Sequence, residues 1–187
     1  WVLIPLIITL FNFILAFTVY PSLPSKLPTH WNFQGEITTY SNKSYGVVLL
    51  LPIVQLGMVG MFYLIYWMIK KTKQQIDPNN PEESLKKSII FKKAWSIYLL
   101  ILLMLITIEF SVLSLLTYGI IFETTRAVDV LNWIILIFSI AGGFVLSIKL
   151  GQGGEKLKLK EEDKEEIIYR KDDAEMWKLG NTIYYNP

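Results

Sequence analysis

The sequence contains no cysteine and a single histidine, His30. Without cysteine the chain forms no disulfide, binds no metal through thiolates and has no cysteine nucleophile, and cysteine content says nothing about its redox compartment. It also has no His-Glu-x-x-His helix, Gly-x-Ser-x-Gly elbow, phosphate-binding glycine loop or basic-aromatic nucleic-acid surface. These absences argue against conventional hydrolases, nucleotide-driven pumps and nucleic-acid-binding proteins.

Charge is nearly absent from four long stretches. Residues 2–20 and 47–69 are uncharged, 94–118 contain only Glu109, and 130–150 contain only Lys149. At about 1.5 Å per residue each stretch can cross a hydrocarbon core of about 30 Å as a helix. A signal peptide is the rival interpretation of the first stretch, but Tyr20-Pro21-Ser22 offers no convincing cleavage site. With 52% hydrophobic residues and a mean hydropathy of +0.40, the chain is predicted to be an all-α polytopic protein of the lipid bilayer.

Lysine and arginine are concentrated in two segments. Seven lie in the loop 70–93 and seven in the charged tail 151–187, whereas the loop 21–45 and the link 119–129 share only Lys26, Lys43 and Arg126. Because positive residues stay on the cytoplasmic side, both termini of this cell-membrane protein are predicted to be cytoplasmic and the loop 21–45 to be outside. The four-helix domain covers 1–150. Since the chain starts at Trp1 and stops within a motif, we expect the native protein to continue at both ends.

Four polar residues of the spans share one depth. Asn12, Gln55, Glu109 and Ser139 lie eight or nine residues below the outer ends of their spans, which is roughly 12–14 Å. An acid near the bilayer centre costs about 3 kcal/mol on insertion scales and is expected to face the bundle interior. The cluster is either a protonatable or ligand-facing centre, or an interhelical hydrogen bond that clamps the bundle. Thr107, Ser111 and Ser114 form a separate stripe nearly opposite Glu109, which indicates close packing.

The loop 21–45 is the main candidate for recognition. Pro21, Pro24 and Pro28 favour an extended chain and disfavour a helix before His30. His30 could contact a ligand or a metal with help from Glu36, Glu123 or Asp129, or it could hydrogen-bond to the loop backbone. A single histidine with scattered carboxylates is a weak metal signal, so no metal or cofactor is predicted.

A segment of this loop resembles a known signature. The run from Tyr20 to Glu36, YPSLPSKLPTHWNFQGE, followed by Tyr40-Ser-Asn-Lys43, is similar to that of the SdpI-like family of bacterial membrane proteins of unknown function, whose namesake gives immunity to a secreted peptide. The resemblance implies a cytoplasmic-membrane protein whose outer loop recognises a peptide or envelope component. It carries over Pro28, His30, Asn32 and Gly35 as signature positions, and Trp31 lies among them. A tail motif, Trp177-x-x-Gly180-x-x-x-Tyr184-x-Asn-Pro187, resembles a small bacterial motif appended to such proteins.

The leading hypothesis is a non-enzymatic membrane protein that senses or neutralises an extracellular peptide through residues 21–45 and signals to a cytoplasmic partner. One alternative is a transport or proton-coupled subunit that uses Glu109. Another is a membrane-embedded metal enzyme at His30. No nucleic acid is expected as a partner.

Overall fold

The computed structural model describes residues 3–32, 36–72, 77, 80–121 and 125–159. These residues divide into two compact units. The first unit comprises the described parts of Trp1–Ile65 and Leu99–Ile140, and the second those of Tyr66–Tyr98 and Ala141–Pro187. Expectations for Gly35 and Glu123, and for the tail beyond residue 159, lie outside the described residues.

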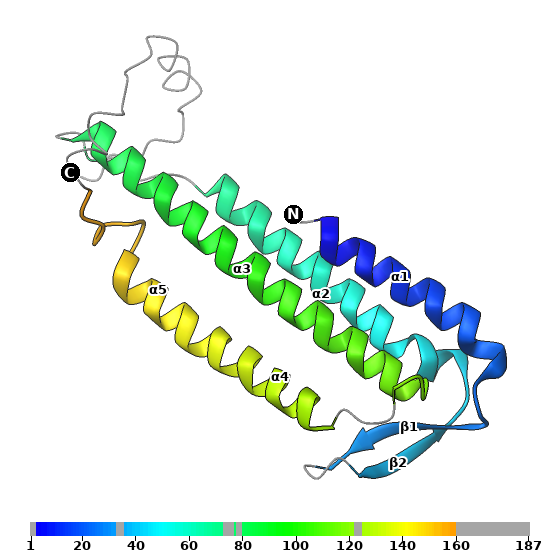
Figure 1. Cartoon of the computed structure of the whole chain (residues 1–187). Helices are drawn as coiled ribbons and strands as arrows, with labels where there is room; N and C mark the ends of the chain where they lie inside the picture. Colours follow the sequence, from blue (N-terminus) through cyan, green and yellow to red (C-terminus); the bar gives the residue numbers. More distant parts are fainter. Residues whose placement is uncertain (1–2, 33–35, 73–76, 78–79, 122–124, 160–187) are drawn as a thin grey trace. The chain divides into compact units, whose positions relative to one another are not determined.

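Within the described part of the chain, four helices are long and apolar enough to span a membrane, so the predicted helical membrane fold is confirmed. They contain helix α1 (Leu3–Val19), helix α2 (Tyr45–Lys71), helix α3 (Pro81–Thr117) and the pair α4 (Thr125–Ile137) and α5 (Gly143–Leu150) (Figure 1). Each includes most of one of the charge-poor stretches, because a helix satisfies its own backbone hydrogen bonds where no water is present.

Local signals explain several helix ends. The Ser44 hydroxyl accepts a hydrogen bond from the Val47 amide at 3.2 Å and so caps the start of α2. Helix α3 ends just before Gly119, whose φ of 66° suits glycine. The amides of Gly119 and Ile120 donate to the carbonyls of Leu116 and Leu115, a pattern that satisfies the last carbonyls of the helix.

The segment between α1 and α2 contains a β-hairpin that the sequence analysis did not predict. After a 3₁₀ turn (Tyr20–Ser22), strand β1 (Lys26–Trp31) pairs antiparallel with strand β2 (Ile37–Asn42). The expectation of an extended chain before His30 agrees with β1. In Figure 1 the hairpin projects from the end of the first unit where α1 ends and α2 begins.

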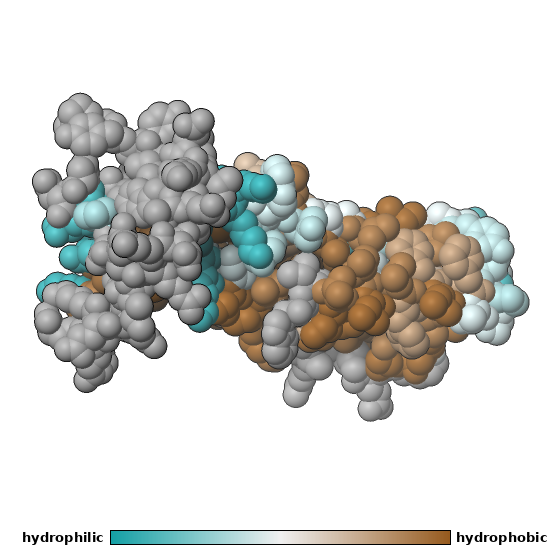
Figure 2. All heavy atoms as spheres, turned by 90° about the horizontal axis from the view of Figure 1, so that it is seen from above, coloured by the Kyte–Doolittle hydropathy of each residue, from teal (hydrophilic) through white to brown (hydrophobic). Residues whose placement is uncertain are grey.

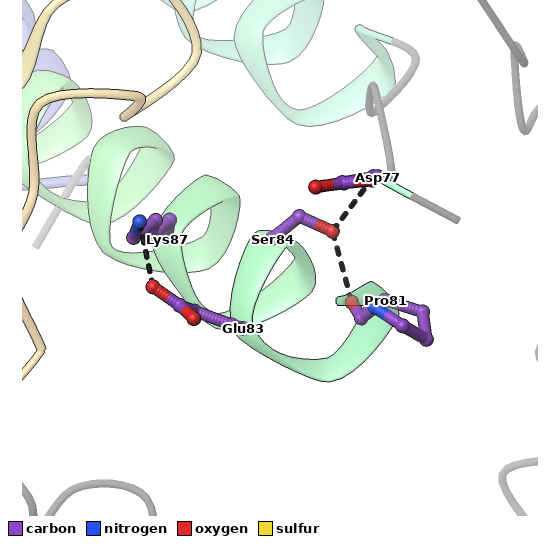
Figure 3. Close-up of polar contacts among 5 residues, drawn as sticks. All are labelled: Asp77, Pro81, Glu83, Ser84 and Lys87. Carbon is purple, nitrogen blue, oxygen red and sulfur yellow. Dashed lines mark hydrogen bonds and ion pairs between the residues drawn. The ribbon is translucent and has the colours of Figure 1, made fainter. Parts of the chain in front are cut away.

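Helix α3 is longer than expected. The helix predicted to start at Pro81 does start there, but it runs without interruption to Thr117, because no proline or glycine follows within it. At its first turn the Ser84 hydroxyl accepts from the Asp77 amide and donates to the Pro81 carbonyl, both at 3.0 Å (Figure 3). Lys87 pairs with Glu83 one turn earlier, at 2.7 Å.

The fourth span is interrupted by a π-helical turn, Phe138–Gly142. In the second unit Tyr98 lies against Gly142 and Gly143, and a Cβ at Gly142 would be 2.7 Å from its ring. The glycines therefore allow a close approach that any larger residue would block.

Apolar side chains cover much of the described surface. On the face shown in Figure 2 they form a broad band. In a soluble protein such a surface would be unusual, but in a bilayer it faces lipid tails. Exposed examples from three helices of the first unit are Ile7, Phe11, Leu50, Leu64 and Trp133.

Candidate functional site

The base of the hairpin is anchored by Lys43. Its ammonium group donates to the carbonyls of Leu23 at 2.8 Å and Pro21 at 3.3 Å, and it lies 4.9 Å from the centre of the Tyr20 ring. Tyr20 in turn stacks on Tyr45, with ring centres 3.9 Å apart. Lys43 therefore ties the end of the second strand to the 3₁₀ turn that follows α1, through two backbone carbonyls and an aromatic face.

A small apolar cluster lies beneath the hairpin. Leu27 of β1 is fully buried and packs in a cluster with Ala16 of α1, Leu23 before β1, Val48 of α2 and Tyr118 just after α3. The inward side of β1 is therefore part of the protein core, whereas all of β2 except Ser41 is exposed. The hairpin is thus packed against the helices through β1, while most side chains of β2 are exposed.

The tip of the hairpin is closed by Asn32 and Glu36. The backbone N–H of Asn32 donates to the backbone carbonyl of Glu36 at 2.9 Å. The side-chain NH₂ of Asn32 donates to the Glu36 carboxylate, and its side-chain oxygen accepts from the backbone N–H of Glu36. Asn32, predicted as a recognition residue, therefore has its side chain engaged in shaping the turn.

His30 and Trp31 are placed differently from Asn32. His30 is exposed on β1, and the described residues offer its imidazole no hydrogen bond. Trp31 is half-buried beside it. Pro28 is half-buried opposite Tyr40. The hydrogen bond from His30 to the loop backbone, one of the two alternatives, is not seen among the described residues.

No cluster of three or more His, Asp or Glu side chains that could hold a metal occurs among the residues that the structure describes.

A polar network connects three helices of the first unit. The Asn12 amide of α1 donates to the Gln55 side-chain oxygen of α2 at 2.8 Å and to the Ser111 hydroxyl of α3 at 2.7 Å. The Gln55 amide donates to the Thr107 carbonyl at 3.0 Å and to Ser111 at 3.4 Å. Asn12, Gln55 and Thr107 are at most 3% exposed. The network satisfies polar groups that would otherwise be unpaired in hydrocarbon.

The structure brings together only two of the four residues predicted to share one depth. Asn12 and Gln55 are bonded, whereas Glu109 and Ser139 are not part of the network. Glu109 is half-buried and has no hydrogen bond to a described residue, and Ser139 donates to the Leu136 carbonyl of its own helix. Ser111 takes the place expected for Glu109, because α3 turns its small-residue stripe toward α1 and α2.

Tyr118 compensates for a proline in α2. Pro52 has no N–H, so the Val48 carbonyl four residues earlier lacks its usual helical donor. The Tyr118 hydroxyl donates to this carbonyl at 2.8 Å in a buried position. The sequence analysis missed this pair, although a proline within a span is a signal to search for a substitute donor.

Comparison with known families identifies one segment. Residues 7–56 match a domain of unknown function, DUF1648. The DUF1648 segment includes most of α1, the whole hairpin and α2 as far as Leu56. It therefore contains both Asn12 and Gln55, while their partners on α3 lie outside it. No curated protein and no solved structure matches the chain.

Proposed function

We propose that this chain is a multi-pass membrane protein that binds an extracellular peptide at the hairpin and so senses it or protects the cell from it. In this proposal the hairpin faces outside and the lysine-rich segments after α2 face the cytoplasm, where a protein partner receives the signal. The charge distribution supports this orientation. The resemblance of the loop to the SdpI-like signature supports the recognition role.

One observation carries the proposal. The exposed His30 and the half-buried Trp31 lie on a strand whose base is fixed by Lys43 and by the buried Leu27. A binding surface held in place before the ligand arrives loses less conformational entropy on binding. An imidazole with no described partner is available for an external ligand, and the half-buried indole of the following residue keeps part of its surface for contact.

The arrangement gives less support to a transport function. A proton path would be expected to connect Glu109 with other polar groups in the spans. Among the described residues, the network of Asn12, Gln55 and Ser111 forms without it. The hairpin therefore remains the better-supported site.

Growth protection tests the proposal. A susceptible bacterial host that produces the protein should tolerate at least one member of a panel of secreted membrane-active peptides at a concentration about fourfold higher than the empty host. His30→Ala and Trp31→Ala should each remove most of this protection, since truncating a central contact commonly weakens binding by about tenfold or more. Thr18→Val, at an exposed site on α1, should retain it.

Protein levels in the membrane must be equal for all variants. If the host gains no tolerance to any peptide, or if His30→Ala and Trp31→Ala protect as well as the wild type, the hairpin is not the recognition site.

A further inference from the structure

Strand β2 is an edge strand with little of the usual protection. Its pairing with β1 is irregular between Ile37 and Thr39, but it is regular from Tyr40 to Asn42. Among the residues that the structure describes, the sheet has two strands, and β2 is exposed at every position except Ser41. Natural edge strands are commonly blocked by charges or proline, which prevent another chain from pairing with them. Residues 37–42, Ile-Thr-Thr-Tyr-Ser-Asn, contain neither. β1, in contrast, contains Lys26 and Pro28.

The register shows which backbone groups of β2 face outward. The Lys43 amide donates to the Ser25 carbonyl at 2.8 Å, which marks this pair as a hydrogen-bonded one. In an antiparallel ladder such pairs alternate with pairs whose N–H and C=O groups point away from each other. Counting along the regular register from this pair, Asn42 (opposite Lys26) and Tyr40 (opposite Pro28) belong to pairs that are not hydrogen-bonded to each other. Their main-chain donors and acceptors therefore lie along the free edge.

The free edge of β1 is less complete. Pro28 pairs with Tyr40, so it occupies the same kind of position, where an N–H would point outward. Proline has no N–H, and it is tolerated there because no ladder bond is lost. The two edges of the hairpin thus differ. The outer edge of β1 lacks an N–H donor at Pro28, whereas the outer edge of β2 has the N–H donors and C=O acceptors of both Tyr40 and Asn42.

The charges around β2 are also asymmetric. Lys26 is exposed at the base of the hairpin opposite Asn42, and Glu36 is exposed at the tip. A strand added beside β2 would lie two strand spacings, about 10 Å, from β1. The side chain of Lys26 on β1 can bridge part of this distance. This arrangement is complementary to a segment that is neutral in the middle and acidic toward the base.

We propose that the outer edge of β2 binds an extended peptide by strand addition, through the main-chain groups of Tyr40 and Asn42. This inference rests on the proposed function and specifies how the peptide is held. Backbone pairing supplies affinity with little demand on sequence, and the neighbouring side chains supply preference. The occupant is a peptide segment that is uncharged opposite Ile37–Asn42 and acidic near Lys26.

The test uses full-length protein in nanodiscs and peptides selected on it from a random twelve-residue phage library. Tyr40→Pro removes the outward N–H and keeps the ladder, so the selected peptides should bind about tenfold more weakly. Tyr40→Val keeps the N–H and is the matched control, and its affinity should stay within about threefold of the wild type.

N-methylation of the peptide gives an independent readout. In a paired strand, alternate amides face the partner, so methyl groups at every second residue should abolish binding and those between should be tolerated. Amide I infrared spectra of ¹³C=O-labelled peptide should show the shift of a β-strand on binding to the wild type and to Tyr40→Val.

The outcomes separate the two proposals. Peptides that bind Tyr40→Pro as well as the wild type, with no alternation in the methylation scan, overturn strand addition and leave hairpin recognition standing. Failure to select any peptide, together with absence of growth protection, overturns both. If Tyr40→Pro instead changes a dimer into a monomer in detergent, the edge is occupied by a second copy and the peptide proposal is wrong.

Discussion

Replacing Gln55 with methionine should lower the free energy of unfolding by about 1–3 kcal/mol. Gln55 is 1% exposed, and its side chain bonds to Asn12, Thr107 and Ser111. Methionine keeps an unbranched side chain of similar length and removes every one of these bonds. Unfolding in mixed micelles with increasing dodecyl sulfate measures the change.

A double-variant cycle separates the hydrogen bond from packing. Asn12→Leu alone should also destabilise, because it leaves the Gln55 oxygen without its 2.8 Å donor. Replacing both partners by apolar residues is often nearly neutral, so Asn12→Leu with Gln55→Met should cost clearly less than the two single changes added together. Thr18→Val, which removes an exposed bond to the carbonyl of Leu15, is the control and should change stability by less than about 0.5 kcal/mol. Exact additivity in the cycle would contradict a shared network.

Removing the hydroxyl of Tyr118 by Tyr118→Phe should lower the free energy of unfolding by about 1–2 kcal/mol, since it leaves the buried Val48 carbonyl without a donor. The same micelle assay measures this. Tyr45→Phe is the matched control, because Tyr45 is 55% exposed and contributes through ring stacking, so its loss of a hydroxyl should have little effect.

The effect of Tyr118→Phe should depend on whether residue 52 is proline or alanine. Alanine restores an N–H that can donate to Val48 within α2, so the Tyr118 hydroxyl is no longer required there. In that background Tyr118→Phe should cost less than about 0.5 kcal/mol. An equal cost in both backgrounds would mean that Tyr118 acts through other contacts.

The spans could be predicted because membrane helices require long runs without charge, and such runs are visible in the sequence. Interruptions were harder to predict. The change in composition near residue 94 predicted two helices, but α3 is continuous from Pro81 because no helix breaker lies within it. The π-helical turn at Phe138–Gly142 and the close approach of Tyr98 to Gly142 and Gly143 are features that sequence spacing does not specify.

The polar network shows why depth alone was insufficient. Counting residues correctly placed Asn12 and Gln55 at one level, and they are bonded. It also placed Glu109 there, but the level does not say which way a side chain faces. Ser111, two residues farther along, lies about 200° around the helix from Glu109 and meets both partners. The recognised stripe of small polar residues was the better guide to the interface.

The hairpin could have been predicted in part. The β-branched and hydroxyl residues of Ile37–Asn42 favour a strand, and Gly35 lies in the interval before them. The three prolines predicted an extended chain before His30, but they did not predict which segment pairs with it. The anchoring role of Lys43 could not be predicted, because it depends on carbonyls at Pro21 and Leu23 that only the folded turn brings together.

Cysteine labelling on intact cells tests the central claim most directly, namely that the hairpin faces outside and the lysine-rich end of α2 faces the cytoplasm. Residues 1–187 contain no cysteine, so single substitutions in this chain have no background. Thr38 and Lys71 are both exposed. Thr38→Cys should react with an impermeant maleimide on intact cells, and Lys71→Cys should react only after the membrane is opened. Labelling of Lys71→Cys but not Thr38→Cys on intact cells would contradict the account.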